Sequence, residues 1–324
     1  MILHKDYDIL YKAIKETSDN TGIADYFIEK DYWISLVLKR LSESKYVDSV
    51  VFKGGTSLSK GFKLINRFSE DVDIAVINTS ELSGNQLKSL IRTVEKEIAR
   101  DLTEIEVNGV TSKGSRFRKA VYEYDEIEPS STGNIVSNTL IVEINSFANP
   151  YPYVKVSIQS MVGEFLQKNN QNELIKKYGL EPFELYVLDK KRTLIEKIVS
   201  LIRFSFDENY IDSISSKIRH FYDIYYLLQD SESNTYFNSE SFITDFTELL
   251  NHDRKAFDEP KGWVNKKLSS SPIVKEFDSI WNKIKSKYTN ELSIFAYSQI
   301  PREGDVQSTF NEVVKKLKNI IDSF

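Results

Sequence analysis

The sequence predicts a two-lobed α+β protein, with a mixed sheet in the first lobe and a mostly helical second lobe. Short apolar runs rich in β-branched residues recur before Pro150 and end at glycines or turn-forming residues, as strands do. Beyond Pro152, long stretches with one-turn apolar periodicity replace them. A length of 324 residues is typical of two domains. We therefore predict one domain over residues 1–165 and a second over residues 166–324.

The elements of the first lobe follow from the spacing of its apolar residues. A helical lead-in comes first, because Ile28, Trp33 and Leu36 recur at about one-turn intervals. A short β-branched run then ends at a glycine pair, as a buried strand does before a tight turn. In chain order we expect a helical lead-in over 7–41, a strand over 47–52, a helix over 56–65, a strand over 71–77, a helix over 82–102 and strands over 120–124 and 139–144.

The second lobe is expected to consist of helices. Their apolar residues recur with helical periodicity over segments longer than most strands. The expected helices cover 187–203, 218–228, 237–250 and 306–321. In the first lobe, residues 128–134 are rich in proline, serine and glycine, which predicts a loop or hairpin connection between the last two strands.

Composition narrows the kinds of site the chain can carry. The absence of cysteine excludes disulfides, thiolate zinc sites and cysteine nucleophiles. With only three histidines, a metal should sit among carboxylates, which suit Mg²⁺ or Mn²⁺. A net charge of -5 argues against non-specific coating of nucleic acid but allows a local basic patch. No apolar run has membrane-spanning length and no signal peptide opens the chain, so we expect a cytoplasmic protein with no membrane partner.

A glycine pair at the end of the first predicted strand is the first candidate functional motif. Gly54 and Gly55 can turn the strand into a helix whose free N–H groups face an anion. Thr56 and Ser57 can cap that helix and also hydrogen-bond a phosphate, with Lys60 about one turn on. The spacing is not that of a P-loop. A plain tight turn between strand and helix explains the glycines equally well.

Two aspartates form the second motif. Asp71 and Asp73 lie two residues apart in a predicted strand, so their carboxylates share one face while apolar neighbours fill the other. Carboxylates this close repel each other unless a cation neutralises them, and a divalent cation does so naturally. Glu143 is the best candidate for a third acid because its strand-like surroundings place it opposite apolar neighbours. The alternative for Glu143 is a solvated edge glutamate.

The two motifs together indicate nucleotide transfer. Gly54, Gly55, Thr56 and Ser57 would hold a triphosphate, while the aspartates would bind one or two Mg²⁺ or Mn²⁺ ions. An acceptor hydroxyl would attack the α-phosphorus of a nucleoside triphosphate and release pyrophosphate. Positioning and charge neutralisation would supply most of the rate enhancement.

Three blocks of the chain resemble the AbiEii/AbiGii toxin family of nucleotidyltransferases, which includes the MenT toxins. They are residues 28–33, residues 54–57 and residues 67–73. The resemblance implies a polymerase-β-like minimal nucleotidyltransferase core, with Ser69 as a further triphosphate contact. It also implies a toxin of an abortive-infection type toxin–antitoxin system with a role in antiviral defence. By the same resemblance the acceptor is the 3′ end of tRNA, and a separately encoded antitoxin controls the toxin.

A later family motif, K-x-x-x-E-x-K-x-x-x-L, is matched in part. Lys191, Lys197 and Leu201 occupy its lysine and leucine positions, while Ile195 replaces the glutamate and Glu196 stands next to it. By resemblance, Lys197 contacts the triphosphate or stabilises charge in the transition state. A surface ion pair on a helix is the alternative for this lysine.

The motif R-x-x-K-D-x-x-D-L is also matched in part. Arg219, Asp223 and Leu227 fit it, while Tyr222 and Tyr226 replace the lysine and the second aspartate. By resemblance, Asp223 positions the nucleotide or the incoming hydroxyl. Because of these substitutions, a further hypothesis remains: the chain could be a nucleotide-binding interaction module without catalysis.

The sequence motifs do not identify the acceptor of the transferred nucleotide. Transfer to a protein hydroxyl, or to a small molecule such as an antibiotic, is the alternative to RNA. If RNA is the acceptor, the basic segments over residues 113–119 and 190–192 are expected to meet its backbone. The alternative for both segments is a solvated face.

Overall fold

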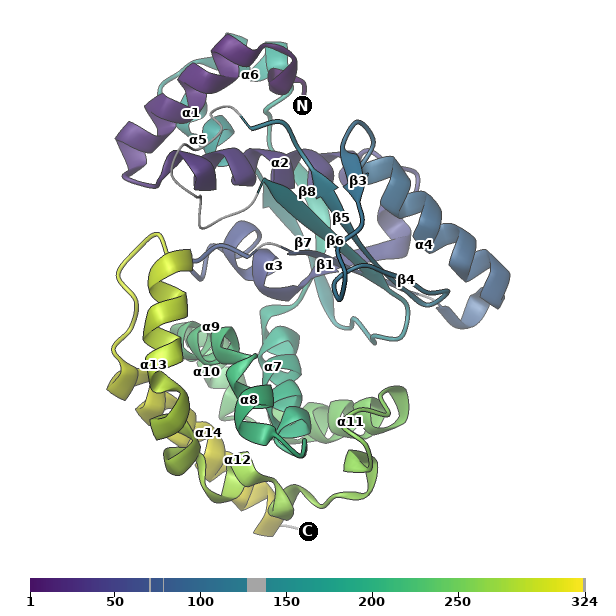
Figure 1. Cartoon of the computed structure of the whole chain (residues 1–324), viewed down its shortest axis with the longest axis vertical. Helices are drawn as coiled ribbons and strands as arrows, with labels where there is room; N and C mark the ends of the chain where they lie inside the picture. Colours follow the sequence, from purple (N-terminus) through teal and green to yellow (C-terminus); the bar gives the residue numbers. More distant parts are fainter. Residues whose placement is uncertain (70, 78, 127–137, 323–324) are drawn as a thin grey trace. The chain divides into compact units, whose positions relative to one another are not determined.

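A computed structural model of the chain describes residues 1–69, 71–77, 79–126 and 138–322 (Figure 1). It divides into two compact units. Unit 1 comprises Met1–Lys63 and Phe68–Leu188, and unit 2 comprises Leu64–Arg67 and Asp189–Phe324. The boundary expected after residue 165 lies in α5 (Met161–Lys168), inside unit 1. A compact unit is not by itself an independently folding domain, so the two predicted domains stay a prediction.

Unit 1 contains a mixed sheet, and its described residues form eight strands in the order β3-β5-β6-β2-β1-β8-β7, with β4 paired to β5. Parallel pairing joins β2 to β6 and β1 to β8, while the other neighbours are antiparallel. The strands are β1 (Val50–Lys53), β2 (Asp71–Val76), β3 (Thr103–Ile105), β4 (Ser112–Lys113), β5 (Phe117–Glu123), β6 (Thr139–Asn145), β7 (Tyr153–Ile158) and β8 (Phe183–Leu188). The predicted α+β class and mixed sheet are confirmed.

Helices cover one face of this sheet. The helices α2 and α4 pack against each other and against β6, with α2 also on β8 and α4 on β5. A Ser83–Gln86 capping box starts α4, whose buried stripe fits the amphipathic pattern of its sequence. The helices of unit 1 are α1 (Tyr7–Thr21), α2 (Asp25–Ser42), α3 (Gly54–Lys60), α4 (Gly84–Ile98), α5 (Met161–Lys168) and α6 (Asn172–Tyr178). The apolar side chains of β2 and β6 lie in this core.

Unit 2 is helical, as predicted. Its helix α9 packs against α7, α10, α13 and α14, and rings from three of these helices, Phe221, Trp281 and Phe310, meet in its core. The helices are α7 (Lys190–Phe204), α8 (Tyr210–Ser215), α9 (Ile218–Gln229), α10 (Ser231–Phe237), α11 (Glu240–Ala256), α12 (Pro272–Lys275), α13 (Phe277–Phe295) and α14 (Glu303–Asp322).

Several elements differ from the expectations. The strands β7 and β8 lie beyond Pro152, where only helices were expected, because they pair with each other and β8 pairs with β1. The helix expected over 56–65 begins earlier and ends earlier, as α3. The helix expected over 187–203 starts after β8, where the Asp189 side chain accepts a hydrogen bond from the Lys191 backbone N–H at 2.8 Å. The loop expected over 128–134 lies outside the described residues.

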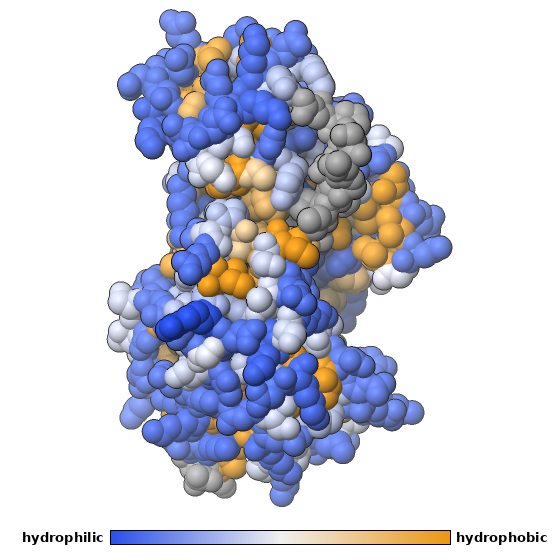
Figure 2. Space-filling view, turned by 60° about the vertical axis from the view of Figure 1, so that its left-hand side comes forward, coloured by the Kyte–Doolittle hydropathy of each residue, from blue (hydrophilic) through white to orange (hydrophobic). Residues whose placement is uncertain are grey.

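The molecular surface is mostly polar. The face drawn in Figure 2 is largely hydrophilic, with apolar residues in small groups. Among the described helices, none combines the length and the apolar character needed to cross a bilayer.

Candidate functional site

Three acids share one face of the sheet in unit 1. Asp71 and Asp73 are two residues apart in β2, and Asp73 is the cross-strand partner of Glu143 in β6. Directly paired residues point to the same side of a sheet, so all three carboxylates lie on one face. Val72 and Ile74, between and beside the aspartates, are 0% exposed on the opposite face. The predicted convergence of these acids is therefore present in the structure.

Two lysines extend this acid cluster into a charged row across four strands. Lys119 of β5 pairs with Glu143, and Lys53 of β1 pairs with Asp73. The Lys119 ammonium lies 3.4 Å from a Glu143 carboxylate oxygen and 3.9 Å from an Asp71 carboxylate oxygen. From β5 to β1, the row therefore consists of Lys119, Glu143, Asp73 and Lys53. Asp71 lies two residues before Asp73 in β2.

The acids hold more negative charge than the lysines compensate. Burial, followed by the charges of Glu143 and Asp71, raises the pKa of Asp73 to about 8, although Lys53 and Lys119 oppose that rise. Burial alone would lower the pKa of Lys119, but the nearby carboxylates outweigh it and raise that pKa. Asp73 therefore sits where additional positive charge is favourable.

The chemistry of the acid cluster suits a hard divalent cation. Its donors are carboxylate oxygens on neighbouring strands, and such oxygens are the ligands Mg²⁺ and Mn²⁺ prefer. Across the described ranges, no three His, Asp or Glu side chains are already grouped so that they could hold a metal ion. By the chemistry of their oxygens, Asp71 and Asp73, with Glu143 as a third acid, would be the residues to hold such an ion.

Gly54 lies directly against this cluster. Its φ is +80°, a left-handed conformation that glycine adopts easily, and a Cβ there would stand 1.9 Å from Asp73 Oδ2. Two features therefore require glycine at position 54: the backbone conformation of the turn from β1 into α3, and the short distance between this backbone and the Asp73 carboxylate. The tight turn was predicted from the sequence, whereas the close approach of Gly54 to Asp73 is visible only in the structure.

The hydroxyls after the glycines have partners within unit 1. Thr56 Oγ1 donates to the Asp71 carbonyl at 2.5 Å, and Ser57 Oγ donates to the Gly54 carbonyl at 2.8 Å. Both residues are buried. The Thr56 bond fixes the start of α3 against β2, whereas the Ser57 bond lies within α3. Neither side chain caps the helix as predicted, because α3 already begins at Gly54. Ser69 precedes β2, and its hydroxyl makes no hydrogen bond to the described residues.

Lys60 forms a buried ion pair with a residue outside the acid cluster. Its ammonium lies 2.6 Å from Asp31 Oδ1 and donates to the Gln159 carbonyl at 2.9 Å. The other Asp31 oxygen accepts the Met161 backbone N–H at 2.7 Å. Lys60 therefore ties α3 to α2 and to the start of α5, which is a structural role.

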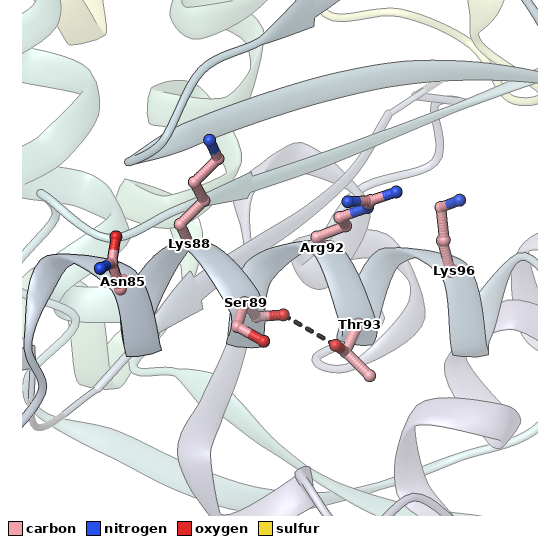
Figure 3. Close-up of a pocket in the computed structure, with 6 residues that line it drawn as sticks. All are labelled: Asn85, Lys88, Ser89, Arg92, Thr93 and Lys96. Atoms are coloured by element: carbon pink, nitrogen blue, oxygen red, sulfur yellow. Dashed lines mark hydrogen bonds between the residues drawn. The ribbon is translucent and has the colours of Figure 1, made fainter.

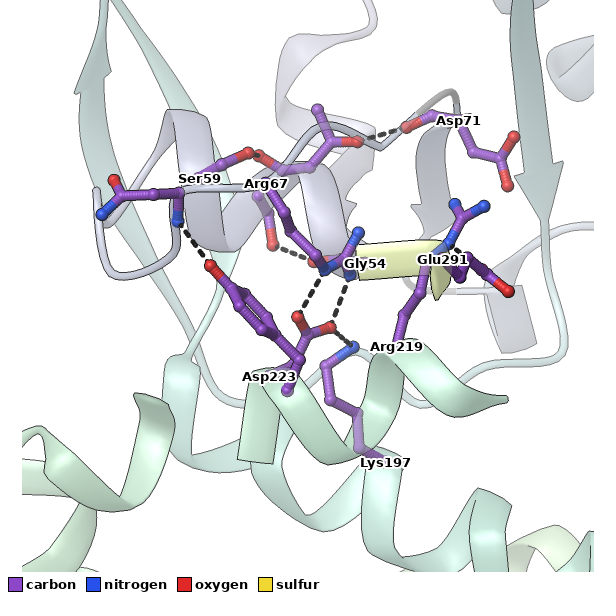
Figure 4. A network of polar contacts seen from close by, with 12 residues as sticks. Gly54, Ser59, Arg67, Asp71, Lys197, Arg219, Asp223 and Glu291 are labelled. Carbon is purple, nitrogen blue, oxygen red and sulfur yellow. Dashed lines mark hydrogen bonds and ion pairs between the residues drawn. The ribbon is translucent and has the colours of Figure 1, made fainter. Parts of the chain in front are cut away.

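Lys197 and Asp223 meet in unit 2. Asp223 accepts two hydrogen bonds from Arg67, at 2.7 and 2.6 Å, and lies 2.7 Å from the Lys197 ammonium (Figure 4). All three are buried. Burial alone would raise the pKa of Asp223, but Arg67 and Lys197 outweigh it and hold that pKa well below its usual range. The Arg67–Asp223–Lys197 triad carries two cations on one carboxylate.

Other members of the later motifs also make structural contacts in unit 2. Arg219 forms an ion pair with Glu291 at 2.7 Å. The Tyr222 hydroxyl accepts the Asn66 backbone N–H at 3.3 Å, and its ring packs on Tyr226 with centroids 4.8 Å apart. The two tyrosines that replace polar residues of the family motif therefore belong to the packing of α9.

Sequence reasoning placed Lys119 in a basic segment and did not connect it to the acids. The structure divides that segment by alternation: Lys119 faces the acid cluster, whereas Arg118 reaches Glu95 on the helix-covered face. Lys113 pairs with Glu104 at 2.9 Å. Alternation along the strand could have placed Lys119 and Arg118 on opposite faces of the sheet. The pairing of Lys119 with Glu143, however, depends on the register between β5 and β6. Arg67 begins the block 67–73 and Lys53 directly precedes the glycine pair, but sequence reasoning assigned a role to neither.

Comparison with known proteins gives a family match over most of the chain. The family model described as nucleotidyl transferase AbiEii toxin, type IV toxin–antitoxin system, matches residues 36–312, which confirms the resemblance seen in the sequence. MenT4, a nucleotidyltransferase toxin from Mycobacterium tuberculosis H37Rv, is similar at 14% identity and a TM-score of 0.39, with 96% of this chain and 98% of that chain covered. Among curated proteins, none matches.

Proposed function

We propose that this chain, which belongs to the AbiEii family of nucleotidyltransferase toxins from type IV toxin–antitoxin systems, transfers a nucleoside monophosphate at the acid cluster of unit 1. Asp71, Asp73 and Glu143 on one sheet face, with Gly54 against Asp73, are the observation that carries this proposal. Family membership itself makes the chain a nucleotidyltransferase with a nucleoside triphosphate as substrate and an antitoxin as partner.

In the proposed reaction, an acceptor hydroxyl oxygen attacks the α-phosphorus. An O–P bond forms, the bond to the leaving pyrophosphate breaks, and the hydroxyl proton passes to a carboxylate or to water. A divalent cation bound by Asp71 and Asp73 would neutralise charge on the triphosphate and on the leaving group. Gly54 lets the backbone approach the site, and Lys53 and Lys119 add positive charge beside the acids.

The acceptor that we propose is the 3′ end of tRNA. Support for it comes from the family resemblance of residues 54–57 and 67–73. Contacts of Ser69 and Lys197 with the triphosphate, and a positioning role for Asp223, are carried over from the same resemblance. In unit 2, Asp223 already bonds to both Lys197 and Arg67, so a role at the nucleotide would add to a structural one.

The acceptor can be identified by following the transferred label. The protein is incubated with each α-³²P-labelled nucleoside triphosphate, MgCl₂ and either total tRNA or a cell lysate. Label on tRNA supports the proposal. Label on protein or on a small molecule, with none on RNA, would replace the tRNA acceptor with one of those alternatives.

A matched pair of variants tests the site. Asp73→Asn should reduce transfer on the order of 100-fold or more, because it removes a ligand for the cation that stabilises the transition state. Asp48→Asn, at an exposed aspartate of the same unit, should leave transfer unchanged. Full activity in Asp73→Asn would place the chemistry elsewhere. Nucleotide binding without any pyrophosphate release by the wild type would instead indicate a non-catalytic binding module.

A further inference from the structure

One exposed face of α4 carries a regular line of cations. Lys88, Arg92 and Lys96 are spaced four residues apart and are all exposed. Figure 3 shows their side chains leaving the same side of the helix. Residues four apart are neighbours on a helix surface, so the three charges form one stripe about 12 Å long at 1.5 Å per residue. We call these three residues the α4 basic stripe.

A second row of polar side chains runs beside the stripe. Asn85, Ser89 and Thr93 line the same open groove, which has a volume of about 450 Å³. The Thr93 hydroxyl donates to the Ser89 carbonyl at 2.8 Å (Figure 3), and Asn85 and Ser89 are exposed. The groove therefore combines cations with neutral hydrogen-bonding groups.

The cations of the stripe have no ion-pair partner among the described residues. Other basic residues of unit 1 do: Lys113 pairs with Glu104, and Arg118 pairs with Glu95. Glu95 belongs to α4 itself, but it is buried and its carboxylate is paired with Arg118. The stripe thus places three exposed cations without ion pairs to the described residues on a chain whose net charge is -5, although Lys96 lies near enough to Glu104 to help lower the pKa of that carboxyl.

We propose that the α4 basic stripe binds the phosphate backbone of an RNA acceptor. Lys, Arg, Ser, Thr and Asn side chains are the groups that contact phosphates in nucleic-acid complexes. No apolar or aromatic side chain lines the groove, whereas the centre of a protein interface is usually apolar. The proposal rests on the proposed function, because it names the surface on which that reaction's acceptor is held.

The salt dependence of RNA binding tests the stripe directly. A fluorescein-labelled RNA hairpin with a single-stranded 3′ end is titrated with protein between 50 and 300 mM KCl, without nucleotide. In the variant Lys88→Gln, Arg92→Gln, Lys96→Gln, the slope of log K against log salt should fall by about 2 to 3, because each lost phosphate contact contributes about 0.7–0.9. The single variant Arg92→Gln should lose about a third of that.

A charge-matched control separates the stripe from overall charge. Lys275→Gln, Lys283→Gln, Lys287→Gln removes the same charge from exposed lysines of unit 2 and should keep the wild-type slope. Circular dichroism checks that both triple variants stay folded. An unchanged slope in the stripe variant, or an equal fall in the control, overturns the proposal. Stripe-dependent binding of polyglutamate that is tighter than RNA binding would also overturn it, in favour of an acidic protein.

The outcome is independent of catalysis because no nucleotide is present. A slope that falls as expected, together with no labelled RNA in the transfer assay, would support the stripe and contradict the proposed acceptor reaction. Labelled tRNA together with an unchanged slope would support the proposed acceptor reaction and contradict RNA binding by the stripe.

Discussion

At the scale of single residues, Gly54 is the position where geometry leaves least freedom. A side chain there would have to occupy space now filled by the Asp73 carboxylate, and would hold φ at +80°. Gly54→Ala should therefore lower the free energy of unfolding by about 1–3 kcal/mol and should also displace Asp73 and reduce transfer. Urea denaturation and the labelled-nucleotide assay measure the two effects.

Gly84→Ala is the matched control for that substitution. Gly84 is the first residue of α4, its φ is not in the left-handed region, and a Cβ there would meet no atom within 4 Å. This variant should be neutral or slightly more stable, because alanine restricts the unfolded chain more than glycine does. If both variants lose equal stability, the close approach to Asp73 is not the cause.

Lys119 makes a second residue-scale prediction. Its ammonium already neutralises part of the acid cluster, at 3.4 Å from Glu143 and 3.9 Å from Asp71, and it would repel an arriving cation. Lys119→Met should therefore tighten Mn²⁺ binding about tenfold, equivalent to about 1.4 kcal/mol. Electron paramagnetic resonance of free Mn²⁺ measures the affinity. Lys113→Met, which removes a lysine paired elsewhere, should leave the affinity unchanged, and weaker Mn²⁺ binding in Lys119→Met would contradict the prediction.

At the scale of elements, the triad connects α7, α9 and the segment Leu64–Arg67 within unit 2. Asp223→Asn leaves Arg67 and Lys197 buried without a compensating carboxylate, which should cost about 3–5 kcal/mol of stability at neutral pH. Because the pKa of Asp223 is held low in the folded state, its contribution is fully present above the unfolded pKa of about 3.9 and is lost as the pH falls through the folded value. The gap between wild type and variant should thus narrow below pH 4.

At neutral pH, Asp253→Asn is not expected to lower the stability of the protein, in contrast to Asp223→Asn. Burial raises the pKa of Asp253, so the folded state favours its protonated form, and the stability this gives at low pH is lost as the pH rises through the folded pKa. The variant should match or exceed the wild type at neutral pH. Urea melts of both variants at pH 3 and pH 7 make the comparison. A pH-independent loss in Asp223→Asn would show that its carboxylate charge is not what stabilises unit 2.

The elements also show how far the sequence could be read. Alternation placed Asp71 and Asp73 on one face because it depends only on neighbours along the chain, and glycine chemistry located the turn at Gly54. The strand β8 was missed because its place is set by pairing with β1, more than a hundred residues away. The position of Lys119 beside Glu143 depends on the same kind of long-range register, which a single sequence does not reveal.

At the scale of the whole molecule, the family match spans parts of both units. Residues 36–312 include the acid cluster of unit 1 and the triad of unit 2. The later family motifs are substituted at Ile195, Tyr222 and Tyr226, and the two tyrosines pack on each other in α9. The earlier motif keeps its glycines and aspartates. Gly54, Asp71 and Asp73 of the proposed site therefore lie in the blocks that resemble the family, whereas Glu143 and Lys119 lie outside those blocks.

A cation held by the acid cluster should stabilise the whole chain by mass action. At a free Mn²⁺ concentration 100 times its dissociation constant, the gain is about 2.7 kcal/mol, seen as a higher urea midpoint. The double variant Asp71→Asn, Asp73→Asn should lose this gain. It should also be at least as stable as the wild type without metal, because the repulsion among Asp71, Asp73 and Glu143 is removed. Asp48→Asn should keep the full metal-dependent gain. The same gain in the double variant would place the cation outside the acid cluster, and a metal-free loss of stability would mean that the aspartates support the fold rather than strain it.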